Sequence, residues 1–203
     1  MRIAPRLLAA GLVGALALST LPAQAGPLAY PDPAGDATAV DDANPPRPSD
    51  PELDLLDVSW STTSDELVVS TTLGAIGEPV ASNGWAVAHY FTYEDIRFEL
   101  LVQDVGTPSS AVFSDGVYLR VAGDSSTEYP CVCRFNVEPG AARVRVHIEL
   151  HSLGSAVRFI DPSTPRPGAG STFTSLETIS SRVVGFLFAA DHAAPPPETI
   201  FVV

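Results

Sequence analysis

The sequence predicts an all-β protein, an antiparallel, jelly-roll-like β-sandwich that follows an N-terminal signal peptide. Three observations support this class. Short apolar stretches of period two recur from Leu53 onward, which is typical of half-buried strands. They are separated by many turn formers, with 19 prolines and 15 glycines in 203 residues, and no convincing apolar stripe of helical period stands out. The apolar content of 45% can cover a core, so the chain should fold as one domain.

Residues 1–25 have the organisation of a secretory signal peptide. Arg2 and Arg6 precede an apolar run from Leu7 to Leu21, and Ala23-Gln24-Ala25 matches the small-x-small pattern of a cleavage site. The run is shorter than the ~20 residues that cross a bilayer, which argues against a retained anchor. We therefore expect a mature chain that begins at Gly26 and is secreted to the extracellular side.

The charge balance limits the partners. Eleven basic and 24 acidic side chains give a formal net charge of -13, and every basic residue is an arginine. Such a chain is unsuited to the phosphate backbone of nucleic acids. We expect no nucleic-acid partner, no membrane association after signal cleavage, and a monomer.

Residues 26–52 should form an extended leader that is rich in proline and acidic residues. The run Asn44-Pro45-Pro46-Arg47-Pro48 fits neither a helix nor a central strand. The sandwich domain is then predicted over residues 53–203. Within it we expect strands near residues 55–61, 67–73, 85–93, 96–102, 117–122, 131–137, 144–150, 183–190 and 199–203.

The clearest strand pattern lies near residue 146. Apolar side chains alternate there with polar ones, and the apolar set should face the core: Val144, Val146, Ile148 and Leu150 against Arg143, Arg145, His147, Glu149 and His151. Residues 157–179 contain three prolines and two close glycines, and we expect a long loop with one short helical turn.

An acidic segment could hold a metal ion. The turn Asp32-Pro33-Ala34-Gly35-Asp36 precedes further acids at positions 41, 42, 50, 52, 54 and 57. Calcium takes six to eight oxygen ligands in flexible geometry, which such a segment could supply. The spacing is not that of an EF-hand, and a solvated acidic loop is the alternative.

Three segments carry a resemblance to a known group of domains. They are Asp32-Pro33-Ala34-Gly35-Asp36-Ala37, Asp54-Leu55-Leu56-Asp57-Val58-Ser59 and Asp65-Glu66-Leu67-Val68-Val69. Together they resemble secreted bacterial β-sandwich domains related to the family-9-like carbohydrate-binding modules and the C-terminal binding module of glucodextranase. The resemblance implies a structural calcium ion near the first and last strands. Its ligands would be Asp32, Asp36 and Asp54, with Asp191 as a looser match.

Histidine and cysteine pairs offer two weaker hypotheses. His147 and His151 would chelate zinc on a helix, but on the expected strand they stand about 13 Å apart, so a solvated strand face is favoured. Cys131 and Cys133 are the only cysteines of an exported chain. Residues at this spacing in a strand are poorly placed for an unstrained bond, so a strained disulfide and two thiols both remain open.

Aromatic side chains could stack on sugar rings. Trp60, Trp85 and Phe91 fall in apolar registers and should fill the core, whereas Tyr90 has the opposite parity. Tyr90 and Tyr118 are therefore the candidate ligand-binding residues.

No established catalytic motif is present. The chain lacks a G-x-S-x-G elbow and a G-x-x-x-x-G-K phosphate loop, and no catalytic residue is assigned. We expect a secreted, non-catalytic, calcium-stabilised module that binds carbohydrate, or a cell-surface or extracellular protein. The alternatives are a small secreted hydrolase using scattered carboxylates, and an accessory exoprotein without a ligand.

Overall fold

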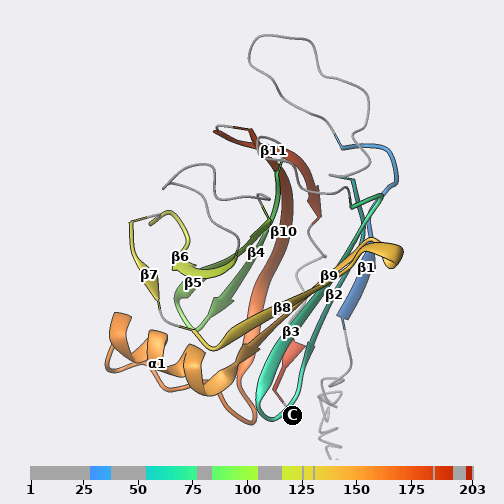
Figure 1. Ribbon diagram of the computed structural model, residues 1–203. Helices are drawn as coiled ribbons and strands as arrows, with labels where there is room; N and C mark the ends of the chain where they lie inside the picture. Colours follow the sequence, from blue (N-terminus) through green and yellow to red (C-terminus); the bar gives the residue numbers. More distant parts are fainter. Residues whose placement is uncertain are drawn as a thin grey trace, which may run out of the picture.

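The protein is an all-β sandwich of two antiparallel sheets with one α-helix among the residues described (Figure 1). The computed structural model describes residues 28–37, 54–76, 84–104, 116–124, 126–129, 131–184, 186–193 and 200–202. The predicted signal peptide and the proline run at positions 45–48 lie outside these ranges, as do the acids at positions 41, 42, 50 and 52. The predicted sandwich class is confirmed.

The first sheet has five strands in the order β1-β2-β3-β9-β8. Their bounds are β1 Leu28–Pro31, β2 Leu55–Thr62, β3 Glu66–Leu73, β9 Arg143–Glu149 and β8 Cys133–Glu138. β1 lies within the segment that was expected to be an extended leader. It pairs with β2, with Tyr30 opposite Val58, so the sandwich includes part of that leader.

The second sheet has seven strands. Its path is β11-β10-β4-β5-β6-β7, and β12 pairs with the start of β10. The bounds are β4 Gly84–Tyr93, β5 Ile96–Asp104, β6 Gly116–Val121, β7 Glu128–Tyr129, β10 Thr172–Val184, β11 Phe186–Ala193 and β12 Ile200–Phe201. The single strand predicted over residues 183–190 is wrong, because that segment contains the end of β10 and most of β11.

The core lies between the two sheets. Trp60 and Phe91 are fully buried and Trp85 is 5% exposed, as their registers predicted. The ring of Phe91 stacks on Phe98 at 5.4 Å and meets Phe173 edge-on at 5.7 Å. These ring contacts therefore join β4, β5 and β10 within the core.

Helix α1, Leu150–Ile160, corrects two expectations. The alternation on β9 ends at Glu149, so Leu150 and His151 begin the helix instead of continuing the strand. The expected long loop over residues 157–179 is also wrong, because it contains the end of α1 and the first half of β10. Leu150, Leu153 and Val157 are buried, and their spacing forms a short helical stripe on the core.

Between α1 and β10, Asp161 organises a turn. Its carboxylate accepts hydrogen bonds from the Ser163 amide at 2.8 Å and from the Ser163 and Thr164 hydroxyls at 2.7 Å each. These bonds lower the pKa of Asp161 to about 2.

Among the helices in the described ranges, none combines the length and hydropathy needed to cross a membrane.

Candidate functional site

The D-x-x-G-D segment forms a tight turn directly after β1. Gly35 has a φ of +86°, a left-handed conformation that glycine adopts without strain. Its amide donates to both carboxylate oxygens of Asp54 at 2.9 Å, and the amide of Asp32 donates to the carbonyl of Leu56 at 3.1 Å. The turn is therefore fastened to the start of β2, and Asp54, only 6% exposed, is its anchor.

Asp191 approaches this turn from the other sheet. It lies near the end of β11, opposite Ser180 of β10. Its Oδ2 accepts a hydrogen bond from the amide of Leu55 at 2.6 Å, and its Oδ1 accepts one from the amide of His192 at 2.8 Å. The side chain thus bridges β11 to the start of β2 and closes one end of the sandwich.

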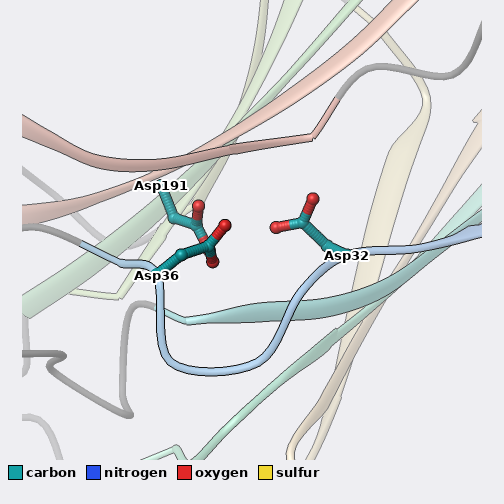
Figure 2. Close-up of side chains that lie close together, drawn as sticks. All are labelled: Asp32, Asp36 and Asp191. Atoms are coloured by element: carbon teal, nitrogen blue, oxygen red, sulfur yellow. The ribbon is translucent and has the colours of Figure 1, made fainter.

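Three carboxylates converge between these elements (Figure 2). One oxygen from each of Asp32, Asp36 and Asp191 lies within 4.8 Å of the others. The Oδ2 atom of Asp32 is buried without a hydrogen-bond partner. Converging carboxylate oxygens are the donor set that calcium accepts, and these three residues could hold one ion together with carbonyl and water oxygens.

The structure brings together three of the four residues predicted as ligands. Asp54 lies outside the converging group, because both of its oxygens accept the Gly35 amide. Asp54 is nevertheless close enough for its charge to raise the pKa of Asp32. The role of Asp54 as a calcium ligand stays a prediction.

At Asp32 the opposing charge of His192 has a smaller effect on the pKa than the charges of the three nearby aspartates. The pKa of Asp32 is raised from 3.8 to about 6, first by burial and then by the charges of Asp191, Asp36 and Asp54. Burial also raises the pKa of Asp191, against the opposing effect of the two amide hydrogen bonds that it accepts. A bound divalent cation would remove both penalties.

A chain of polar side chains lies in the core beside the cluster. Tyr30, two residues before Asp32, accepts a hydrogen bond from Trp60 Nε1 at 3.2 Å and also bonds to Thr178. The Thr178 hydroxyl lies 3.0 Å from Nδ1 of His89. Burial lowers the pKa of His89 to about 3, so this histidine is neutral. The available sequence signal was the parity of His89, which matches the inward-facing Trp85 and Phe91.

The two tyrosines predicted to bind ligand lie on the outer face of the seven-stranded sheet. Tyr118 is opposite Leu101, and Tyr90 is opposite both Glu99 and Glu177. The guanidinium of Arg97 lies over the ring of Tyr90, and that of Arg120 over the ring of Tyr118, each at 5.4 Å. Each ring therefore already has an arginine of the same chain against one face.

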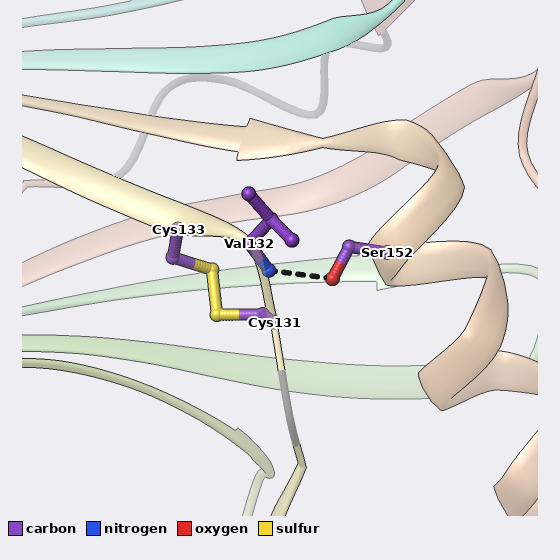
Figure 3. The surroundings of a disulfide bond; sticks show 4 residues. All are labelled: Cys131, Val132, Cys133 and Ser152. Atoms are coloured by element: carbon purple, nitrogen blue, oxygen red, sulfur yellow. Dashed lines mark hydrogen bonds between the residues drawn. A yellow bond between two sulfur atoms is a disulfide. The ribbon is translucent and has the colours of Figure 1, made fainter.

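Cys131 and Cys133 form a disulfide at the start of β8 (Figure 3). Val132 between them is 58% exposed. Its amide donates to the Ser152 hydroxyl of α1 at 2.6 Å, and its carbonyl accepts the amide of Glu149 at 3.2 Å. The bridged segment thus joins β8 to the junction of β9 and α1, which is a structural role.

The two candidate histidines do not form a pair. His147 stays on the outer face of β9, where Nδ1 lies 3.0 Å from a carboxylate oxygen of Glu66. His151 is exposed on the first turn of α1. Among the described residues, only the three aspartates form a cluster suited to a metal ion.

Comparison with known proteins adds no assignment. The chain matches no protein-family model, and the search of curated proteins returns no similar sequence.

Proposed function

We propose that the protein is a secreted, non-catalytic β-sandwich module that is stabilised by calcium and binds carbohydrate, or a cell-surface or extracellular protein. The observation that carries this proposal is the convergence of Asp32, Asp36 and Asp191. These carboxylates come from a turn beside β1 and from β11, so a calcium ion between them would clamp two sheets. The resemblance to carbohydrate-binding modules supports the same placement near the first and last strands.

Glu66, at a solvent-accessible hollow, lacks a property that glycoside hydrolysis requires. A glycosidase needs a carboxylic acid whose pKa is raised so that it can donate a proton. Glu66 and Glu149 lie opposite each other on β3 and β9 at a solvent-accessible hollow. The pKa of Glu66 is lowered there, first by its hydrogen bond to His147 and also by Arg134, which is the wrong direction for a general acid.

The proposal is tested by thermal melting of the secreted chain in several millimolar calcium and in metal-free buffer. Binding to the folded state alone adds RT ln(1 + [Ca²⁺]/Kd), which is about 2.7 kcal/mol at a hundred times Kd. We expect Asp36→Asn to lose most of the calcium response. Asp36 is exposed, so this variant should still fold.

The matched control is Asp95→Asn, an exposed aspartate in the turn between β4 and β5. It should keep the full response to calcium. A melting temperature that ignores calcium in the wild type would refute the calcium site and leave the acidic cluster as a solvated surface.

A further inference from the structure

The outer face of the five-stranded sheet carries rows of side chains that are polar except for Val68. The cross-strand partners fall into three such rows: Ser61, Val68, His147 and Arg134; Ser59, Ser70, Arg145 and Asn136; and Asp57, Thr72, Arg143 and Glu138. A hollow of about 420 Å³ lies over these rows, where short serine side chains of β2 and β3 stand next to the longer arginines of β9. The short serine side chains form the floor of the hollow, and the arginine side chains form one of its sides.

A second hollow continues the first along the same strands. Glu66 and Glu149 are the next outward pair after Val68 and His147, and they line a hollow of about 630 Å³. Its far side is formed by the first turn of α1 and by Arg166. From Arg143 to Glu149 the two hollows extend for about 20 Å at 3.3 Å per residue, and we call them together the trough.

Arg143 and Arg145 keep hydrogen-bonding capacity in the trough. Within the described part of the chain, the carboxylate that both approach is that of Glu138, at 3.9 and 3.8 Å, and both side chains are 39% exposed. By contrast, Arg134 contacts Glu66 at 2.6 Å. A guanidinium has five N–H donors, so the loosely paired arginines can donate to a ligand.

Arg166 completes the other end of the trough. A β-carbon at Gly154 of α1 would lie 3.0 Å from the β-carbon of Arg166, so the missing side chain of Gly154 lets the Arg166 segment lie against the helix. Arg166 is exposed and shares its hollow with Asp65, Glu66 and Glu149. Donors and acceptors are therefore mixed at this end.

The distribution of charge selects the ligand chemistry. A polyanion along the trough would meet the carboxylates of Asp65, Glu66 and Glu149, and a polycation would meet Arg143 and Arg145. A neutral chain of hydroxyl groups can both donate to the carboxylates and accept from the guanidiniums. From this mixture of hydrogen-bond donors and acceptors along the trough we infer that it binds a neutral polysaccharide by hydrogen bonding. This inference rests on the binding function proposed above and gives it a surface and a ligand class.

The hydrogen-bonding mode is distinct from stacking on Tyr90 and Tyr118. Among the described residues that line the two hollows, none is a tyrosine, tryptophan or phenylalanine. Binding in the trough should therefore be insensitive to salt, because the ligand is uncharged. It should also depend on the serine floor, which a larger side chain would fill.

The test is affinity electrophoresis of the secreted chain, in calcium, through gels that contain soluble starch, xylan or galactomannan. Polygalacturonate serves as the charged probe, because a polycation would bind this acidic chain without specificity. We expect retardation by at least one neutral polymer, and none by polygalacturonate. Ser70→Ile and Arg145→Ala should each weaken it about tenfold. The first fills the hollow with a larger side chain, and the second removes one hydrogen bond to a charged group, which is worth about this factor.

Thr92→Ile is the matched control for Ser70→Ile, since Thr92 is a half-buried residue on the outer face of the other sheet. It should bind like the wild type, as should Tyr90→Ala and Tyr118→Ala. Unchanged melting temperatures would show that the trough variants fold.

Loss of binding in the tyrosine variants, with binding retained in Ser70→Ile, would overturn the trough and leave the binding module intact. Retardation by polygalacturonate alone would overturn the neutral ligand. If no polymer retards the wild type while calcium still raises its melting temperature, the inferred ligand is refuted and the calcium-stabilised module survives.

Discussion

Carboxylates lie close together in two regions of this molecule, and their pKa values shift in opposite directions in the two regions. At the turn after β1, Asp32, Asp36 and Asp191 converge, and the pKa of Asp32 is raised to about 6. On the outer face of β3, Glu66 lies against His147 and Arg134, and its pKa is lowered. In the first region burial and the charges of neighbouring carboxylates raise the pKa of Asp32, whereas in the second a histidine and an arginine lower the pKa of Glu66. An acidic cluster therefore favours a metal site where no such counter-charge balances it.

The largest expected loss of stability comes from a buried carboxylate that has neither a bound cation nor a positive side chain beside it. Val146 is fully buried on the inner face of β9, and Arg145 beside it is on the outer face. Val146→Asp would bury a carboxylate among apolar side chains, and we expect the domain to unfold. Circular dichroism of the secreted variant should show loss of the cooperative melt.

Arg145→Ser is the control for that substitution, because it changes a charged residue of the same strand on the solvent side. It should shift stability by no more than about 0.5 kcal/mol. Similar losses in both variants would contradict the register of β9.

The second prediction concerns pH. The folded chain holds a proton on Asp32 up to about pH 6, whereas an unfolded chain releases it near 3.8. The folded state binds more protons at Asp32 in this window, so the Asp32 contribution to metal-free stability should fall as the pH rises from about 4 to 6. His89, whose folded pKa is lowered to about 3, contributes a slope of the opposite sign. Melting the wild type and Asp32→Asn in metal-free buffer at intervals across that range isolates the Asp32 slope.

Calcium should reduce this slope, since the ion competes with the proton for the same oxygens. Glu99, whose pKa is also raised by burial, contributes a slope of the same sign that calcium leaves unchanged. The difference between the curves with and without calcium therefore isolates the cluster. Parallel curves would mean that the cluster binds no ion.

The sequence predicts a strand where the alternation of apolar and polar residues runs through it without interruption. Eight of the nine predicted strands match strands of the structure, because their alternation is unbroken or their ends carry turn residues. β10 was missed for a physical reason. A bulge between Thr174 and Glu177, with Ser175 at a φ of +52°, shifts the buried positions from Phe173 to Leu176. Period two is lost at that point.

Helix α1 was missed because it follows β9 without a break. Leu150 fits both the strand alternation and the helical stripe with Leu153 and Val157, and Gly154 weakens the helical signal. In the candidate metal site, the turn could be predicted from Gly35. The anchoring of that turn by Asp54 could not, because it depends on a backbone amide that carries no sequence signal.

The third prediction tests that turn. Gly35→Ala places a β-carbon in a left-handed conformation, which costs about 1–2 kcal/mol, although the added carbon would meet no atom within 4 Å. We expect lower stability without calcium and a weaker calcium response, because Asp32 and Asp36 flank the strained residue. Gly168→Ala is the control, since its added carbon is equally uncrowded and its φ is not left-handed.

The smallest expected change in stability comes from a substitution at Glu66, which lies beside Arg134 and His147. Glu66→Gln removes a carboxylate that contacts His147 at 3.0 Å and Arg134 at 2.6 Å, and the loss should be about 0.5 kcal/mol, as is usual for ion pairs at a protein surface. The folded pKa of Glu66 is depressed below 4.5, so the wild-type advantage should be present above pH 4.5 and vanish as the pH falls below it. This pH dependence is opposite in sign to that of the Asp32 cluster, and calcium should leave it unchanged. A calcium-dependent difference between Glu66→Gln and the wild type would show that the two carboxylate regions are coupled.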